Sequence, residues 1–140
     1  MDRAEIEKIS RLARDEGLGN LTTLVGSQAD TGLPAGCCDA ILVRLVYHHF
    51  TDTAAMRRSL WNALRAGGRI AVIDVPPQTD WRPLAGVPER GGHGIEAAEV
   101  IREMTSSGFE LLSRDDDWPA EDDAVAAVSG ADVGRRVARL

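Results

Sequence analysis

Two nearly continuous apolar runs set the strongest limit on how this chain can fold. They are AILVRLV at positions 40–46 and RIAVIDV at positions 69–75. A strand with one solvent-exposed face alternates apolar and polar residues, whereas a strand buried on both faces of a parallel sheet is apolar almost throughout. Both runs therefore predict central strands of a parallel sheet that is covered by helices.

Three segments place apolar residues three or four positions apart, which is the spacing of an amphipathic helix. They are residues 4–16, the stretch from a cap at Thr51 or Asp52 to a turn at Gly67–Gly68, and residues 96–107. Shorter apolar runs predict further strands at 21–25, 109–114 and 123–129, and glycine-rich loops occupy 26–39 and 78–94. The predicted order α-β-β-α-β-α-β-β, without a repeat or a dividing linker, indicates one α/β domain over residues 1–140.

The composition excludes several classes of protein. Apolar residues make up 44% and charged residues 27% of the chain, which is typical of a globular protein rather than a disordered one. No run approaches the roughly 18 apolar residues of a membrane span, and the charged N-terminus lacks the apolar core of a signal peptide. The net charge of -6 argues against nucleic-acid binding. We therefore expect a cytoplasmic protein that binds neither membranes nor nucleic acids.

The two cysteines, Cys37 and Cys38, are neighbours in the sequence. Adjacent cysteines are poorly placed to bond to each other without strain, and the C-x-x-C spacing of zinc sites is absent. We expect them to be small, partly buried and reduced, as in a cytosolic compartment.

Four sequence motifs, in this order along the chain, resemble those of a known family. They are GLGNLTTLVGS, LPAGCCDAILVRLVYHHFTD, LWNALRAGGRIAVIDVPP and HGIEAAEVIREMTSSGFELLSRDDDWP. Over residues 4 to about 119 the chain resembles the later part of a class I S-adenosylmethionine-dependent methyltransferase. The resemblance implies a partial Rossmann-like sheet of about five strands with flanking helices, S-adenosylmethionine as cofactor, and a small molecule as methyl acceptor.

The resemblance also implies where the cofactor would lie. Ligands of doubly wound sheets bind beyond the carboxyl ends of the strands. The implied cofactor-binding residues are Gly26, Ser27, Gln28, Asp30, Arg44, Leu45, Tyr47 and His48. The resemblance does not imply a particular catalytic residue.

One departure from the family concerns the cofactor itself. The family's first strand ends in a glycine-rich turn, and its second ends in an acidic residue for the ribose hydroxyls. No G-x-G-x-G occurs here, and Met1 falls just after the point where the acidic residue would stand. We therefore interpret the chain as a single truncated methyltransferase-like domain.

That interpretation has a consequence for assembly. In the family's sheet the first two strands lie between the third and the fourth, so their absence leaves a gap of roughly 15 Å, or three inter-strand spacings. Either the run at 21–25 moves over to pair with the run at 40–46, or a second chain covers the apolar edge. We expect a homo-oligomer, most simply a dimer, in which exchange of the N-terminal helix and residues 21–25 about the 26–39 loop is one route.

Histidine is a common metal ligand and proton carrier, so His48 and His49 require an explanation. Adjacent residues on an extended segment point in opposite directions, which argues against a shared metal ion. His93 lies in a loop and forms no H-x-x-x-H or HExxH spacing with them. We expect no metal site, with one ring packed under the sheet end and the other lining the cleft.

Arg44 interrupts the apolar run at 40–46. A charge in the middle of a strand needs a partner or must reach the sheet end. We expect Arg44 to contact Asp39 or Asp74, or to lie in the cofactor cleft.

Three functions follow from these observations. The leading one is methyl transfer from S-adenosylmethionine to a small molecule, an activity that the isolated chain could have lost. The alternative is a non-catalytic methyltransferase remnant that self-associates or binds a protein partner. A metal-dependent enzyme using His48 or His49 ranks third.

Overall fold

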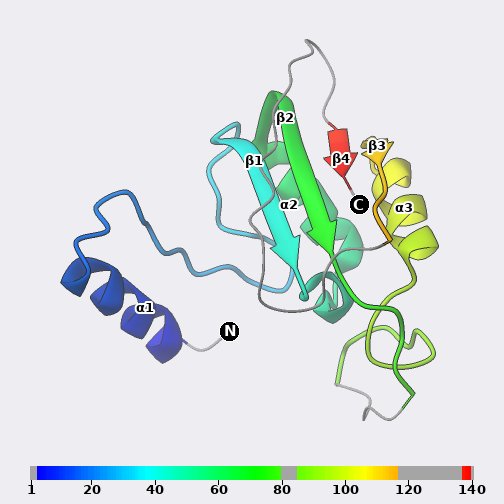
Figure 1. Ribbon diagram of the computed structural model, residues 1–140, viewed down its shortest axis with the longest axis horizontal. Helices are drawn as coiled ribbons and strands as arrows, with labels where there is room; N and C mark the ends of the chain where they lie inside the picture. The colour runs from blue at the N-terminus through cyan, green and yellow to red at the C-terminus, as the bar shows by residue number, and fades with distance from the viewer. Residues whose placement is uncertain (1–2, 80–84, 117–136, 140) are drawn as a thin grey trace.

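The computed structural model describes residues 3–79, 85–116 and 137–139 (Figure 1). The elements in chain order are α1 (Arg3–Asp15), β1 (Cys38–Arg44), the 3-10 turn η1 (Tyr47–His49), α2 (Thr53–Ala63), β2 (Leu64–Ile73), α3 (Ala97–Ser106), β3 (Glu110–Ser113) and β4 (Val137–Arg139). The predicted α/β class is confirmed. None of the helices in this part of the chain is long and apolar enough to span a membrane.

The sheet is parallel and has the strand order β1-β2-β4-β3. Its longest pairing joins β1 and β2, in register from Ala40 opposite Arg69 to Arg44 opposite Ile73. The described residues therefore contain four strands rather than the five expected. The strand predicted at 123–129 lies outside the described residues, and β4 was not predicted.

One core lies between the sheet and helices α2 and α3. It consists of Val43, Tyr47, Met56, Leu60, Leu64, Ile70, Val72, Ile95, Val100, Met104 and Phe109. Helix α2 starts where the sequence predicted, because the Asp52 carboxylate accepts a hydrogen bond of 2.9 Å from the Ala55 amide and so caps the first turn. The helix predicted at residues 96–107 is also confirmed, as α3.

The expectation that β1 is buried on both faces is wrong. Val43 faces the core and is buried, but its neighbour Leu42 points to the other face and is 62% exposed. The reason is that α2 and α3 cover one side of the sheet, while α1 stands apart from β1 (Figure 1). The described residues thus supply helices for one face of this strand only.

The strand predicted at 21–25 is also absent. These residues have no regular structure, and Leu21, Leu24 and Val25 are all exposed. The hydroxyls of Thr23 and Ser10 are hydrogen-bonded at 2.5 Å, so this segment returns to α1 instead of pairing with β1. A strand exists only when a neighbour accepts its backbone hydrogen bonds, and no described strand does so here.

The turn predicted at Gly67–Gly68 lies inside β2 instead of between α2 and the strand. Helix α2 ends at Ala63 and β2 begins at the next residue. The pairing then shifts, because one residue of β1, Asp39, lies opposite four of β2, residues 65–68. Gly67 takes a φ of 77° in this bulge, a conformation that glycine adopts without strain.

A buried ion pair ties α2 to α3. The Glu103 carboxylate of α3 accepts hydrogen bonds from Arg57 Nη1 at 2.7 Å, Arg90 Nη1 at 3.2 Å and the Tyr47 hydroxyl at 2.9 Å. Arg57 is buried, and the Arg90 side chain is 3% exposed. Two buried guanidinium groups therefore share this carboxylate, so its loss would leave both with fewer partners.

We predict that Glu103→Ala lowers the free energy of unfolding by about 3–5 kcal/mol, because it breaks a buried ion pair on one side only. Urea unfolding followed by circular dichroism measures the change. The control is Glu7→Ala on the exposed surface of α1, which should stay within about 0.5 kcal/mol of the parent chain. A loss of less than 1 kcal/mol for Glu103→Ala would show that this network is not a main support of the fold.

Candidate functional site

The chain leaves β1 through a residue in an uncommon conformation. Leu45 has a φ of 52°, the only positive φ of a non-glycine residue in the described part of the chain. Its amide donates a hydrogen bond of 2.7 Å to the Ile73 carbonyl at the end of β2. Such conformations cost free energy in branched residues and occur most often at functional sites. The carboxyl ends of β1 and β2 therefore meet at a strained turn.

The segment after Leu45 is a 3-10 turn over Tyr47–His49 instead of an extended stretch. The turn brings the His48 and His49 rings together, with centroids 4.0 Å apart. The expectation that the two rings point in opposite directions is therefore wrong. Its premise, extended backbone, holds for β1 and ends at Arg44.

The carboxylate of Asp74, directly after β2, holds this turn in place. Asp74 Oδ1 accepts a hydrogen bond of 2.5 Å from His48 Nδ1 and one of 2.9 Å from the Val75 amide. Its Oδ2 accepts a further hydrogen bond of 3.2 Å from the His48 amide. Because an ionised carboxylate only accepts, Nδ1 of His48 carries the proton. Both side chains are buried, with exposed fractions of 3% for His48 and 5% for Asp74.

His93 completes the group from the loop that follows β2. Its backbone pairs with Gln78 through two hydrogen bonds of 2.9 and 3.0 Å. The next residue, Gly94, has a φ of 131°, and a Cβ there would lie 2.5 Å from the Val75 carbonyl oxygen. This close contact fixes the loop against the end of β2, and the Nε2 atoms of His48 and His93 are 3.0 Å apart.

The three histidine rings share one environment. Ligand nitrogens of His48, His49 and His93 all lie within 4.8 Å of one another. Partial burial lowers the pKa of His49, and positive charge on His48 or His93 would lower it further. Sequence spacing could not find this group, because His93 lies 44 positions after His49 in the chain.

Tyr47 belongs to the core rather than to the open side of this turn. Its side chain is fully buried, and its hydroxyl donates to Glu103. Burial, together with the neighbouring Glu103 carboxylate, raises the pKa of the Tyr47 hydroxyl well above its usual range. Of the predicted residues at the β1 end, Tyr47 and His48 are thus buried, while Arg44 and Leu45 are exposed.

Arg44 has neither of its expected carboxylate partners. Asp39 pairs with Arg65, and Asp74 is hydrogen-bonded to His48. Arg44 follows Val43 on the alternating strand, so it points to the face that the helices leave open. The charge is accommodated because this face is exposed, and no carboxylate in the described part of the chain forms an ion pair with it.

The other predicted residues lie in the loop before β1, separate from the turn. Ser27, Gln28 and Asp30 are exposed, and the Ser27 amide donates to the Asp30 carbonyl at 2.7 Å. Asp30 Oδ1 accepts from the Gly32 amide at 2.7 Å and from the Ser59 hydroxyl of α2 at 3.2 Å. Gly26 closes the same turn, since a Cβ there would lie 2.9 Å from the Asp30 carbonyl oxygen. The described contacts of this loop are therefore with itself and with α2.

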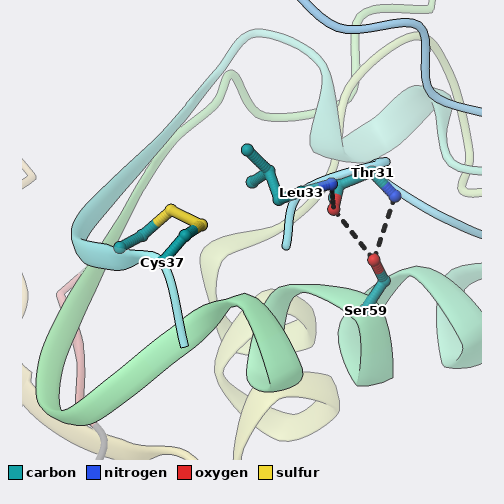
Figure 2. Close-up of a disulfide and its surroundings, with 5 residues drawn as sticks. Thr31, Leu33, Cys37 and Ser59 are labelled. Carbon is teal, nitrogen blue, oxygen red and sulfur yellow. Dashed lines mark hydrogen bonds between the residues drawn. A yellow bond between two sulfur atoms is a disulfide. The ribbon is translucent and has the colours of Figure 1, made fainter. Parts of the chain in front are cut away.

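Figure 2 shows the docking of that loop and the cysteines that follow it. The Thr31 amide and hydroxyl each lie 2.9 Å from the Ser59 hydroxyl. Cys37 and Cys38 are joined by a disulfide, so the expectation of two reduced thiols is wrong. The pair sits in the turn that enters β1, where the Cys37 amide contacts the Pro34 carbonyl at 3.3 Å.

A hollow of about 490 Å³ lies between α2 and the end of α3. It is lined by Ala54, Arg57, Arg58, Trp61, Asn62, Ser106 and Ser107. None of these residues was predicted to bind a ligand, and none belongs to the turn at the strand ends.

Comparison with known proteins identifies the family. No curated protein and no solved structure gives a significant match. Residues 1–72, just over half of the 140, match the sequence profile of a family described as "Methyltransferase domain". The match includes β1, the histidine turn, α2 and most of β2. The chain therefore belongs to the class I S-adenosylmethionine-dependent methyltransferase family that its sequence resembles.

Proposed function

We propose that this chain is a methyltransferase-like protein whose methyl acceptor is a small molecule. The observation that carries the proposal is the strained turn at Leu45, which lies at the carboxyl ends of parallel β1 and β2. In sheets of this kind, ligands bind beyond those ends. Family membership supplies the reaction type, and S-adenosylmethionine is the cofactor that the family implies.

The described residues do not by themselves fit that cofactor. Tyr47 and His48 direct their polar atoms to Glu103, Asp74 and His93. Among the loop residues, Asp30 uses its Oδ1 atom within the loop and with α2. A ligand would have to displace these contacts, and each displaced hydrogen bond costs affinity. We therefore derive no step through the cofactor and propose that a single chain binds it weakly.

Self-association is the second candidate function, and the exposed apolar side chains favour it. Leu42 and Leu45 are exposed at β1, as are Ile9 and Leu12 on α1. β1 is an edge strand among the described residues, and an apolar edge favours pairing with another chain. A second copy is the occupant that we propose, because a two-fold axis would bury the same surface on both chains.

We predict a homodimer at tens of micromolar protein, which sedimentation velocity would detect. Leu42→Glu should shift the population to monomer, because a charge cannot be buried in an apolar interface without a partner. Leu112→Glu is the matched control, since Leu112 is an exposed strand leucine on β3 at the other end of the sheet. A parent chain that sediments as a monomer would exclude self-association, and equal effects of both substitutions would place the interface elsewhere.

We predict that the Leu42→Glu monomer binds S-adenosylhomocysteine with a dissociation constant of about 0.1 mM or weaker. Isothermal titration calorimetry on this variant and on the parent chain separates the two candidate functions. Binding to the parent dimer alone supports a cofactor site that needs both chains. Absence of binding to either form supports a non-catalytic role, and micromolar binding to the monomer would contradict the proposed weak affinity.

A further inference from the structure

The cluster at the strand ends contains every histidine of the chain. We propose that His48, His49 and His93 bind one divalent transition-metal ion, with Zn²⁺ the best fit, and that Asp74 orients His48 as a ligand. The proposal stands on side-chain geometry and does not depend on cofactor binding.

The hydrogen bond between His48 and Asp74 determines which nitrogen is available to an ion. His48 Nδ1 donates to Asp74 Oδ1, so in the neutral ring the lone pair is on Nε2. That Nε2 atom is the one 3.0 Å from His93 Nε2. Histidines that bind metals usually donate their other ring N–H to a carboxylate or carbonyl group, which orients the ring and raises its basicity.

Asp74 is itself held in place. Its two oxygens also accept hydrogen bonds from the amides of Val75, at 2.9 Å, and His48, at 3.2 Å. A carboxylate with fixed oxygens imposes a fixed direction on the imidazole that donates to it. His48 is thus oriented before any ion arrives, which lowers the entropic cost of binding.

The distances suit a tetrahedral ion. Two ligands at 2.0–2.1 Å from Zn²⁺ are about 3.3–3.4 Å apart in tetrahedral geometry. The His48 and His93 nitrogens are 3.0 Å apart, and all separations in the cluster stay within 4.8 Å. Small rotations of the His49 and His93 rings would therefore place all three nitrogens on one ion.

The donor set favours zinc over the alkaline-earth ions. Imidazole nitrogen suits Zn²⁺ and its first-row neighbours, whereas Mg²⁺ and Ca²⁺ prefer oxygen ligands. His48 is buried, but His49 and His93 are partly exposed, so an ion can enter from their side. Three histidine ligands leave a fourth position for water, the arrangement of zinc sites that remain open. An ion here would also link the His93 loop to the turn after β1.

The test uses the full 140-residue chain after treatment with a chelator. Titration with ZnCl₂ by calorimetry should give one ion per chain and a dissociation constant of about 10 μM or tighter. Co²⁺ in place of Zn²⁺ should give the visible absorption bands of a tetrahedral site. Zn²⁺ should also raise the melting temperature, because the ion binds the folded state. Absence of heat and of cobalt bands at 100 μM ion, a concentration about tenfold above that limit, would overturn the proposal.

The variants separate a metal site from a simple Asp74–His48–His93 hydrogen-bond chain. His93→Ala and His49→Ala should each remove the tetrahedral cobalt bands, and melting without metal verifies that both variants fold. Both replace partly exposed side chains, so they disturb the core less than a change at His48. Cobalt bands that persist in His93→Ala, or in His49→Ala, would overturn the three-histidine site.

Further variants test the roles of Asp74 and of the two cysteines. Asp74→Asn should weaken Zn²⁺ binding about 10–100-fold while tetrahedral bands still form at saturating Co²⁺, as expected of a positioning residue. Asp39→Asn, an exposed carboxylate at the start of β1, is the matched control and should leave the affinity unchanged. The double variant Cys37→Ser with Cys38→Ser should also keep its affinity, whereas loss of binding there would assign the ion to the thiols.

Discussion

The parallel pairing of β1 with β2 is the interaction on which the rest of this structure depends. It continues beyond β1, where the Leu45 amide bonds to the Ile73 carbonyl. That bond fixes where the chain turns away from the sheet, and the turn places His48 against Asp74 of the neighbouring segment. The core packs on the same pair of strands, because Val43, Ile70 and Val72 face α2 and α3. Fold and candidate site therefore share one set of backbone hydrogen bonds.

The described chain covers this sheet unequally. One face has a closed core and a buried ion pair around Glu103. The other face exposes Leu42 and the charged Arg44, while α1 stands apart (Figure 1). Burial of apolar surface contributes about 25 cal/mol of stabilising free energy for each Å² removed from water. Covering this face with a second copy would therefore contribute to the free energy of dimer formation. The one-sided sheet is the physical basis of the self-association proposed above.

The histidine cluster places polar groups at the strand ends, which is where ligands of such sheets bind. Asp74 satisfies two backbone amides and one imidazole, and nothing in these contacts needs a cofactor. The buried polar groups are paired with one another, as buried polar groups must be. A ligand that contacts the ring nitrogens of His48 would therefore have to displace Asp74 or His93.

The sequence by itself determined the local elements and the family. Apolar runs at 40–46 and 69–75 predicted β1 and β2, and helical spacing predicted α1, α2 and α3. The four ordered motifs predicted the family whose profile residues 1–72 match. These features depend on residues close together in the chain, so their patterns can be read along it. The prediction of a strand at 21–25 was wrong because a strand needs a partner strand, and local composition does not say whether one is present.

Only the tertiary structure decided what the strand ends bring together. The left-handed turn at Leu45 and the 3-10 turn after it reversed the expected directions of His48 and His49. The pairing of Gln78 with His93 then carried a third histidine to the same place across a long loop. The joined cysteines and the partners of Asp39 and Asp74 likewise depend on contacts in space. Such contacts depend on backbone turns of a few residues, and a pattern of residue types along the chain leaves the direction of those turns open.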